Sequence, residues 1–486
     1  MSNRPFQNNH GSLHRAKTLS SHRDRGLGRD TLRLGIVAIA LGLLGLALPA
    51  AAGERPNILV VVADDLGWAD VGFHGSSIKT PHIDELARTG VVLDQHYVAP
   101  VCSPTRCAFM TGRYWSRFGV NGVVSRRAMA FDTVTVAVAM KAAGYDTAIT
   151  GKWHLGSMPE WGPRKFGFDH SYGSLGGGTG PYDHSYKMGP YTKTWHRDDV
   201  RIQEAGHVTD LIAAEAVHWI ESRGQRPFFL YLPFTAVHIP IDETRQWREV
   251  NPQIQDFNQR LYAACTSHMD DALGRVLAAL ERTGKRSNTL IVFFSDNGGY
   301  PEARNDDPHY PDWHQYVPGP CGGHNEPLRG MKAQLYEGGI RVPALVQWAG
   351  RLKPGTMKSP VHVADWMPTL CTVAGYQPDH DLKWDGQNIW PLLEGQPPAG
   401  PRTIYWKSLN AKGAAVRQGE WKLITYDRGK KPDELFDLSH DPYEKENLAD
   451  RFPERVKDLK AVMAREATRD DDALVKESNP PPPDKD

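Results

Sequence analysis

One stretch of the chain combines residue types and a spacing that suit nucleophilic chemistry. Cys102 is followed directly by Ser-Pro, and Arg106 comes four residues after it, within the segment from Val101 to Arg113. Proline pushes the residues before it toward extended or turn geometry, and a helix can begin just after it. We therefore expect Cys102 at a strand-to-helix elbow, where a helix N-terminus favours an anion. The competing interpretation is a buried or disulfide-bonded cysteine beside a proline turn.

Four oxygen-bearing side chains follow two apolar runs that are typical of strands buried on both faces of a sheet. The runs are 57–63 and 289–294, and the side chains are Asp64, Asp65, Asp296 and Asn297. Sites in open α/β sheets lie at the carboxyl ends of the strands. Adjacent carboxylates are costly there unless a cation neutralises them, and carboxylate and amide oxygens suit a hard cation such as Ca²⁺. Either segment alone is equally an ordinary turn, but the two together predict a metal site.

Basic and imidazole groups follow further strand-like segments. Lys152 and His154 lie two residues apart, so on an extended segment their side chains point to the same side. A fixed cation beside a titratable imidazole suits oxyanion binding and proton transfer, although a surface strand end is the simpler alternative. His238 also follows an apolar run and is a candidate general acid. Lys332, in an Arg-Gly-Met-Lys segment, would by default be a surface lysine.

These motifs need a sheet whose strands end side by side, with helices between the strands. The expected fold class is α/β, with a large central, mainly parallel or mixed sheet flanked by helices, over residues 54–375. A smaller C-terminal α+β subdomain, residues 376–470, is expected to contain a short antiparallel sheet and a closing helix at 453–468. Residues 471–486 end in a proline run and are expected to be a disordered tail.

Residues 157–206 are loop-like and rich in glycine, aromatic residues and histidine. A structureless connection of this length is unusual inside a domain and is often a functional rim. We expect this loop to shape the substrate pocket. The alternative is that its aromatic side chains only fix the loop to the core.

Composition and the N-terminal region bear on partners and location. Lys+Arg and Asp+Glu are both 57, so the net charge is zero and a nucleic-acid partner is not expected. Residues 1–52 read as a secretory signal region, because a basic segment leads into an apolar run of about fifteen residues and a small-residue cleavage site. The mature chain is then exported, periplasmic or secreted, without a stable membrane span. An uncleaved anchor or a misassigned start is the competing interpretation.

Five cysteines leave one unpaired if the other four form bridges, which fits a Cys102 reserved for chemistry; alternatively all five are free.

The motifs occur in an order that resembles the type I sulfatases of the alkaline phosphatase superfamily. The resemblance rests on the Asp-Asp strand end, Cys-Ser-Pro-Thr-Arg, Gly-Lys-Trp-His, the strand before His238, Ser-Asp-Asn-Gly and Arg-Gly-Met-Lys, from residue 55 to about 345. The segment 434–448 also resembles the C-terminal part of the family. Thr105 stands where serine is common, at a position that varies in the pattern. The resemblance implies a sulfuric ester hydrolase of the arylsulfatase type with an alkaline phosphatase-like sheet.

The resemblance further implies that a formylglycine-generating or equivalent maturation enzyme oxidises Cys102 to formylglycine. One hydroxyl of the hydrated aldehyde would attack the sulfur of a sulfate monoester. One Ca²⁺ would bind a sulfate oxygen and would itself be held by Asp64, Asp65, the modified Cys102, Asp296 and Asn297. Mg²⁺ would suit similar ligands.

The resemblance also implies a role for each remaining residue. Arg106 would hold the nucleophile in place, and Lys152 and Lys332 would bind and polarise the sulfate. His238, with Lys332, would help to protonate the leaving alcohol. His154 would take the proton from the second hydroxyl, so that the hydrate collapses to the aldehyde and expels sulfate.

Other functions remain open at this point. A phosphonate or phosphate ester hydrolase of the same superfamily can use the same nucleophile pattern. An inactive exported binding protein is a second alternative, but a degenerate site should have lost some of the motif residues, and none is missing. Among substrates, we favour a sulfated carbohydrate over a small aryl sulfate, because aromatic and histidine-rich loops suit stacking on sugar rings.

Overall fold

The central sheet of the computed structural model has ten strands, and their ends position the motifs described above. The structure describes residues 55–187, 189–305, 319–427 and 431–475, so the predicted signal region at 1–52 lies outside the described residues. The strands are β1 (Asn57–Ala63), β2 (Val91–Leu93), β4 (Asp146–Thr150), β5 (His170–Ser174), β6 (Trp195–Arg197), β7 (Val200–Arg201), β8 (Phe228–Pro233), β9 (Thr289–Ser295), β10 (Ala344–Gln347) and β11 (Gly355–Met357). Their order across the sheet is β11-β2-β10-β9-β1-β8-β4-β5-β6-β7.

The middle of this sheet is parallel. Strand β1 pairs in parallel with β8 on one side and with β9 on the other, and β4 pairs in parallel with β8 and β5. Strand β10 runs antiparallel to β9 and β2, and the pairs β5–β6 and β6–β7 are also antiparallel. The predicted α/β class, with a large mixed and mainly parallel sheet, is confirmed.

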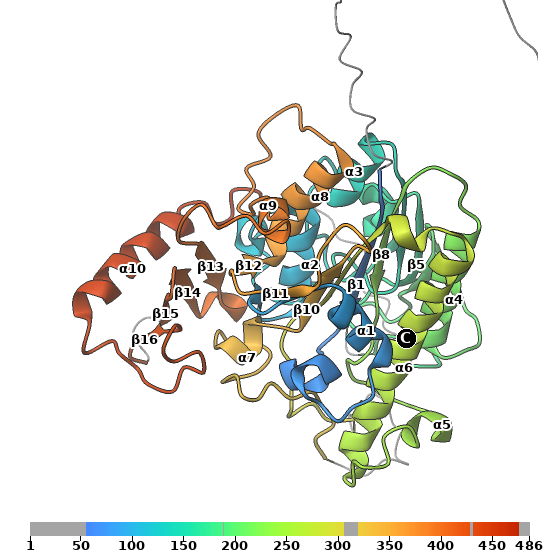
Figure 1. The fold of residues 1–486 in the computed structure, drawn as a ribbon, viewed down its shortest axis with the longest axis horizontal. Helices are drawn as coiled ribbons and strands as arrows, with labels where there is room; N and C mark the ends of the chain where they lie inside the picture. Colours follow the sequence, from blue (N-terminus) through green and yellow to red (C-terminus); the bar gives the residue numbers. More distant parts are fainter. Residues whose placement is uncertain (1–54, 188, 306–318, 428–430, 476–486) are drawn as a thin grey trace, which may run out of the picture. The chain divides into compact units, whose positions relative to one another are not determined.

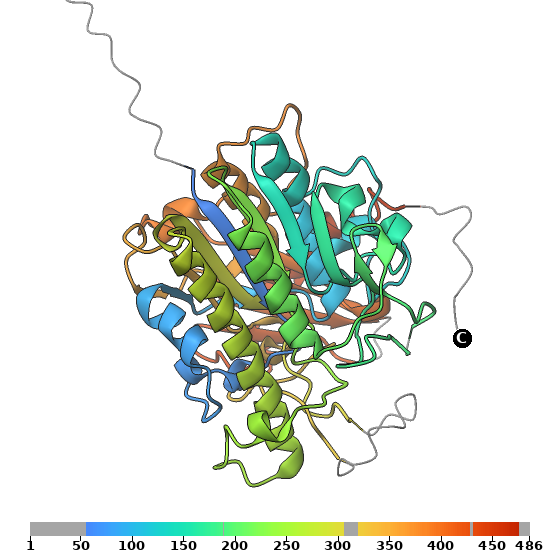
Figure 2. The ribbon, with the colours of Figure 1, turned by 90° about the vertical axis from the view of Figure 1, so that its right-hand side faces the viewer.

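Helices cover both faces of the sheet. One face carries α1 (Pro81–Thr89), α4 (Val208–Glu221) and α6 (Phe257–Arg282), and the other carries α2 (Cys102–Thr111), α3 (Val136–Ala142) and α8 (Trp366–Ala374). Figure 2 shows α4 and α6 side by side across the strands. Along β1, Val60 and Val62 pack toward α2, whereas Leu59 and Val61 pack toward α6. Because both faces are buried, the strand is uniformly apolar rather than alternating.

A second, antiparallel sheet lies near the C-terminus. It consists of β13 (Thr403–Lys407), β14 (Gly413–Gln418), β15 (Trp421–Tyr426) and β16 (Glu434–Asp437), and α10 (Pro453–Ala467) packs on β14 and β15 (Figure 1). The expected C-terminal sheet is confirmed, with β16 as an additional strand. The remaining α-helices and strands are β3 (His96–Tyr97), β12 (Val361–His362), α5 (Arg245–Arg248), α7 (Glu337–Ile340) and α9 (Trp390–Leu393). The described residues from 55 onward belong to one compact unit, and the boundary at residue 375 stays a prediction.

The expectation of a loop throughout 157–206 is wrong, because β5, β6 and β7 lie within this segment and extend the sheet. Strand β5 reads His-Ser-Tyr-Gly-Ser, so its polar and glycine residues hide the strand pattern that apolar residues give elsewhere. Of the predicted tail at 471–486, the structure describes residues 471–475. The backbone N–H of Asp471 donates to Ser116 O at 2.9 Å, and residues 476–486 lie outside the described residues.

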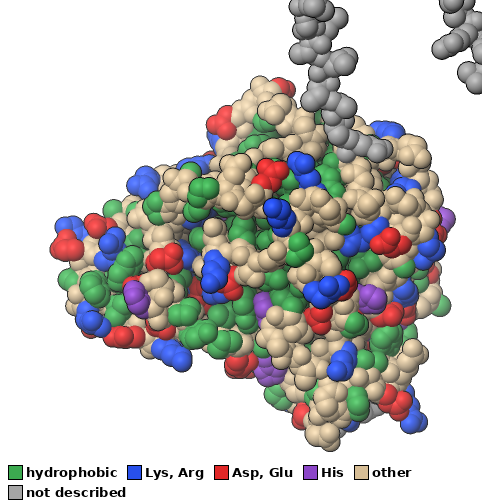
Figure 3. All heavy atoms as spheres, in the orientation of Figure 1, with side chains coloured by type: hydrophobic (Ala, Val, Ile, Leu, Met, Phe, Trp, Pro, Cys, Tyr) green, Lys and Arg blue, Asp and Glu red, His purple; other side chains and the backbone are tan. Residues whose placement is uncertain are grey.

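Acidic and basic side chains are interspersed on the face drawn in Figure 3, as the zero net charge suggests. Within the described ranges, no helix has both the length and the apolar character that crossing a membrane requires.

Candidate active site

The predicted site residues meet at one edge of the central sheet, where four neighbouring parallel strands end. Strand β1 leads into Asp64 and Asp65, and β9 leads into Asp296 and Asn297. Strands β4 and β8 lead into the segments that carry the predicted lysine and histidines. Among these parallel strands, the chain crosses from β1 to β4 on one side, and from β8 it crosses back over β1 to β9 on the other. Such a reversal of the strand order leaves a crevice for a ligand at the carboxyl ends of the strands.

Three carboxylates and a thiol form the centre of this cluster. One ligand atom from each of Asp64, Asp65, Cys102 and Asp296 lies within 4.8 Å of the other three, and all four residues are buried. Burial and the nearby Asp64 raise the pKa of Asp296 to about 6, so the carboxylates strongly disfavour sharing this site without a cation. The group therefore has the charge and the oxygen donors of a site for a hard metal ion.

Asn297 supplies a further free oxygen to the same cluster. Its Nδ2 donates to Asp65 Oδ1 at 2.7 Å, which fixes the orientation of the amide. Its Oδ1 is buried and has no hydrogen-bond partner. An unpartnered buried acceptor costs about 1–3 kcal/mol, so this oxygen is placed as if to coordinate a cation. The donor set fits the predicted metal.

Each of the three carboxylates also contacts its own cation, and of these Lys152 and Arg106 are buried while Lys332 is partly buried. The pairs are Lys152 Nζ with Asp64 Oδ2 at 2.5 Å, Lys332 Nζ with Asp65 Oδ2 at 2.6 Å, and Arg106 Nη2 with Asp296 Oδ2 at 2.8 Å. Burial alone would raise the pKa of Asp65, but Lys332 and then His238 hold it well below its usual range. Burial opposes the charge of Lys332 too, yet Asp65 and Cys102 raise the pKa of this lysine. Burial also opposes the charge of Lys152, but Asp64 raises the pKa of this lysine. Both lysines therefore remain charged, and Lys332 is partly buried, not a surface lysine as expected by default.

Cys102 is the first residue of α2, after the extended residue Val101. Its Sγ donates to Asp64 Oδ1 at 3.6 Å, and its side chain is almost completely buried. Burial raises the pKa of the Cys102 thiol to about 12, against the opposing attraction of Lys152 and Lys332. The unmodified thiol is therefore protonated at neutral pH and is a poor nucleophile.

The elbow at Cys102 differs in one respect from the prediction. The helix begins at Cys102 and not after Pro104, because a proline in the first turn lacks only an N–H that has no intrahelical partner. Arg106 lies one turn further along and binds Asp296 and the Lys152 carbonyl, the latter through Nη1 at 2.8 Å. Its Nε also donates to Asp296 at 3.1 Å, so the guanidinium holds this carboxylate through two of its nitrogens.

His154 lies at the site, but its backbone conformation differs from the predicted extended one. The segment after β4 is not extended, since His154 has a left-handed φ of 56°, so the expected two-residue alternation with Lys152 does not apply. Burial and the neighbouring Lys152 hold the pKa of His154 well below its usual value, and the imidazole is therefore neutral. Its Nδ1 is buried without a hydrogen-bond partner. A neutral ring with an open nitrogen is suited to accept a proton.

His238 lies beside the same cluster. Its Nδ1 donates to the Ile239 carbonyl, and its Nε2 lies 3.7 Å from Asp65 Oδ2. Burial, followed by repulsion from Lys332, lowers the pKa of His238 to about 3. This imidazole is therefore neutral, with Nε2 unprotonated.

Two glycines and a tyrosine belong to this site although the sequence patterns gave none of them an individual role. A Cβ on Gly177 would lie 2.5 Å from His154 Nε2 and 3.1 Å from Tyr186 Oη, and a Cβ on Gly178 would lie 3.6 Å from His238 Cε1. Both histidine rings thus rest against glycine backbone, in the segment expected to shape the substrate pocket. In the sequence, the only signal for these three residues is a run of glycines before an aromatic residue.

All five cysteines are buried and none forms a disulfide bond, so the alternative in which all are free is the one observed.

Comparison with known proteins agrees with this geometry. A family model described as Sulfatase matches residues 56–376. The chain belongs to the sulfatase family. A second family model, described as N-sulphoglucosamine sulphohydrolase, C-terminal, matches residues 331–470. The predicted resemblance to type I sulfatases is confirmed, and the protein is a sulfatase.

Several known sulfatases are similar to this one in sequence, and the similarity covers most of the chain. Arylsulfatase J of Mus musculus is 33% identical over 466 residues, which cover 84% of this chain and 75% of the relative. N-acetylgalactosamine-6-sulfatase of Mus musculus is 32% identical over 420 residues, covering 80% and 75% of the two chains. A solved structure of Ps i-CgsB in complex with k-i-k-neocarrahexaose is 30% identical, with a TM-score of 0.77, and covers 87% of this chain and 96% of that one.

Proposed function

We propose that this sulfatase hydrolyses sulfate monoesters with a formylglycine made from Cys102 and with one Ca²⁺ bound beside it. The observation that carries the proposal is the position of Cys102, at the first residue of a helix and in contact with Asp64. As a thiol this residue is inert, because burial raises its pKa to about 12. Oxidation of the side chain would supply the reactivity that the thiol lacks.

The residues present fit both groups. Ca²⁺ would be held by Asp64, Asp65, Asp296, Asn297 and the modified Cys102, a set of oxygen donors that includes the unpartnered Asn297 Oδ1. When bound, the ion supplies charge neutralisation and polarisation of a sulfate oxygen, and the hydrated aldehyde supplies one hydroxyl for attack on sulfur and a second for release of sulfate.

The lysines bind the sulfate group. Lys152 and Lys332 now neutralise Asp64 and Asp65, at 2.5 and 2.6 Å. With the carboxylates neutralised by Ca²⁺, Lys152 and Lys332 would hold the sulfate oxygens and stabilise the charge that develops during attack. Arg106 keeps Asp296 in place through two hydrogen bonds, which its Nε and Nη2 donate to the carboxylate.

The histidines move protons. His154 is neutral and has an open Nδ1, so it acts as the base for the hydroxyl whose deprotonation precedes sulfate release. The negative charge of a bound sulfate ester raises the pKa of His238, which then carries a proton at Nε2. Together with the charged Lys332, His238 delivers this proton to the leaving alcohol.

A sulfated carbohydrate is the substrate class that we propose. The support comes from two similar proteins, one solved in complex with a neocarrahexaose and one named N-acetylgalactosamine-6-sulfatase. The aromatic residue Tyr186 at the glycine run also suits contact with a sugar ring. An aryl sulfate would occupy the same position with less contact beyond the sulfate.

The chain is also proposed to be exported to the periplasm or secreted, and to meet its maturation enzyme before or during export. The signal region that supports this proposal lies outside the described residues.

Hydrolysis of a panel of esters, measured by release of the free alcohol, tests the proposed function. The panel contains sulfated oligosaccharides, an aryl sulfate, and the matching phosphate monoester and phosphonate. We expect sulfate esters to be preferred and the variant Cys102→Ala to be inactive. Cys107→Ala, in the same helix and also buried, is the matched control and should remain active. Preference for the phosphate or phosphonate ester would favour the superfamily alternative, and an inactive wild-type protein with modified Cys102 would favour the binding protein.

A further inference from the structure

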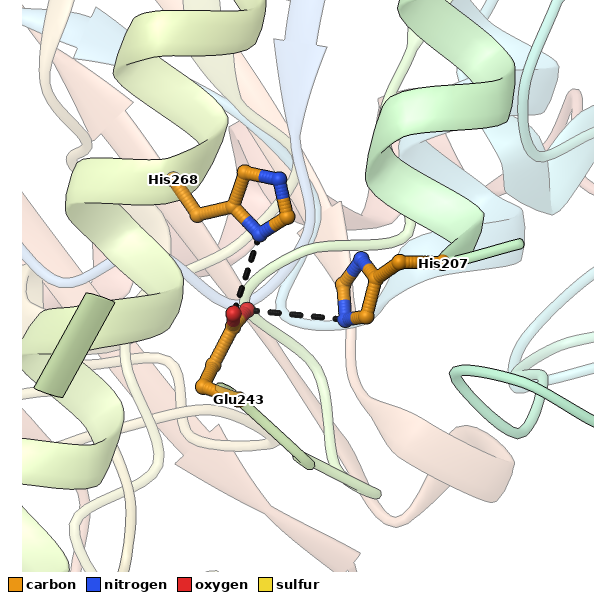
Figure 4. Close-up of side chains that lie close together, drawn as sticks. All are labelled: His207, Glu243 and His268. Carbon is orange, nitrogen blue, oxygen red and sulfur yellow. Dashed lines mark hydrogen bonds and ion pairs between the residues drawn. The ribbon is translucent and has the colours of Figure 1, made fainter. Parts of the chain in front are cut away.

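A second cluster of side chains of the types that bind metals lies on the α4 and α6 face of the sheet. His207 is the N-cap of α4, His268 lies within α6, and Glu243 lies in the segment after β8 that also carries His238. Figure 4 shows the two imidazole rings directed at the two oxygens of the Glu243 carboxylate. His268 Nδ1 lies 2.9 Å from Glu243 Oε2, and His207 Nε2 lies 3.7 Å from Oε1.

This cluster has the compactness of a coordination site. One ligand atom from each of the three residues lies within 4.8 Å of the other two, and all three residues are buried. Glu243 is only 2% exposed, yet its Oε1 has no hydrogen-bond partner. A buried carboxylate oxygen without a partner is rare and costly. The oxygen faces His207, whose Nε2 at 3.7 Å is too far for a hydrogen bond, and an ion among the three side chains would satisfy it.

The surroundings of His268 match those of ligating histidines. Its second nitrogen, Nε2, contacts Asp210 Oδ1 at 3.1 Å, and Arg275 holds the same oxygen at 2.7 Å. The ring stacks on Trp247 with centroids 4.4 Å apart. Metal-bound histidines commonly pass their other N–H to a carboxylate in this way, which fixes the ring and its tautomer.

His207 would bind less favourably than His268. Its Nδ1 accepts a hydrogen bond from the Thr209 N–H at 3.2 Å, so its Nε2 now carries the proton and contacts the Asp242 carbonyl at 3.1 Å. Coordination through Nε2 would move the proton to Nδ1 and remove the cap bond, which weakens but does not prevent binding.

We propose that His207, Glu243 and His268 form a second metal site, which takes a transition-metal dication such as Zn²⁺. Two imidazoles and a carboxylate select such an ion over the hard cation of the all-oxygen cluster. The site is structural: it ties α4 and α6 to the segment that follows β8. Glu243 and His238 lie on the same segment and line one small cavity. An ion bound by Glu243 would therefore restrict the motion of the segment that carries His238.

The test uses the full-length protein with Ca²⁺ in excess, so that the first cluster does not compete for Zn²⁺. Bound Zn²⁺ is measured by equilibrium dialysis with elemental analysis, and thermal unfolding is recorded in parallel. We expect one Zn²⁺ per chain and a higher Tm with Zn²⁺. Glu243→Gln should lower the Zn²⁺ affinity by about 10- to 100-fold.

His170→Gln is the matched control. His170 also lies between two carboxylates, Asp198 at 3.1 Å and Glu215 at 2.8 Å, but these three side chains do not converge as closely as the proposed ligands do. This variant should keep the wild-type affinity for Zn²⁺. Equal affinities of Glu243→Gln and the wild type would overturn the proposal, as would absence of Zn²⁺ binding by the wild type.

A crystal of the wild-type protein soaked with Zn²⁺ gives a test that does not depend on the folding of any variant. Anomalous scattering at the zinc edge should give a peak among His207, Glu243 and His268. A peak only elsewhere would show that this cluster is a hydrogen-bonded network without a metal.

Discussion

Lys152 Nζ lies 2.5 Å from Asp64 Oδ2, and both side chains are completely buried. The other oxygen of Asp64 accepts from the Cys102 thiol. The Asp64 carboxylate therefore contacts both Lys152, which would hold the sulfate, and Cys102, which would attack it after modification. Because these groups come from three separate segments, the site depends on the order of the strands and not on any single motif.

Replacing Lys152 with methionine tests this relationship. We expect kcat/KM for a sulfate ester to fall by about 10²–10³-fold, because a fixed charge at the reacting group is lost. Without added Ca²⁺ the variant should also lose about 3–5 kcal/mol of stability, since Asp64 is left buried and unpaired. Ca²⁺ should restore stability but not activity. The control Lys141→Met removes an exposed lysine, and a similar loss of activity in that variant would refute the assignment.

Removal of the metal should abolish activity reversibly. Chelation is expected to reduce sulfate release to background, and Ca²⁺ to restore it. Asn297→Ala should raise the Ca²⁺ concentration needed for half-maximal activity by about tenfold or more, because the unpartnered Oδ1 is removed. Asn288→Ala, at a partly exposed position before β9, should leave this concentration unchanged. Full activity of the wild type after exhaustive chelation would contradict a metal-dependent site.

Gly177→Ala should act on His154 through a steric contact alone. The added Cβ would lie 2.5 Å from His154 Nε2, so the ring has to move. We expect kcat to fall by about tenfold or more, since a displaced base loses its contribution to proton transfer. Gly224→Ala is the control, because nothing lies within 4 Å of a Cβ there. Wild-type kcat in Gly177→Ala would show that His154 does not act from this position.

Stability should fall in acid because of His96. Burial lowers the pKa of this histidine to about 3, and Trp366 Nε1 donates to its Nε2 at 3.0 Å, so the folded state holds it neutral. The unfolded chain binds a proton below pH about 6.5 and the folded chain does not, so the free energy of unfolding decreases as the pH falls from about 6.5 toward 3. The slope contributed is about 1.4 kcal/mol per pH unit at most.

His96→Gln keeps an acceptor for Trp366 and removes the titration. Denaturant unfolding at several pH values between about 4 and 7 should therefore show a shallower pH dependence in this variant, because one proton-binding difference between the two states is gone. Val123→Ala, a change at an exposed residue that does not titrate, should leave the dependence unaltered. The same slope in His96→Gln and in the wild type would exclude His96 as the cause.

Cys102→Ser separates the proposed chemistry from simple nucleophilic attack. A serine offers one hydroxyl, so this variant should react at most once and then remain as the sulfate ester. Mass analysis should find the ester at residue 102 and no further sulfate release. Multiple turnovers would refute the need for a second hydroxyl.

The sequence predicted the parts of this site that depend on local patterns. Apolar runs ending in carboxylates placed Asp64 and Asp296 at strand ends, because a buried parallel strand has a strong pattern. The pairing of Lys152 with Asp64 was not predictable, since it requires β8 to lie between β1 and β4, which is a long-range property. The strand β5 was missed because its polar residues hide the pattern.

The mass of the tryptic peptide 89–106 reports directly on the proposed modification of Cys102. Trypsin cleaves after Arg88 and Arg106, so this peptide contains Cys102 and excludes Cys107. For protein made in a host able to perform the modification, we predict a loss of about 18 Da relative to the thiol, as expected when –CH₂SH becomes an aldehyde. An unmodified thiol at full occupancy in that host would contradict a formylglycine-dependent mechanism.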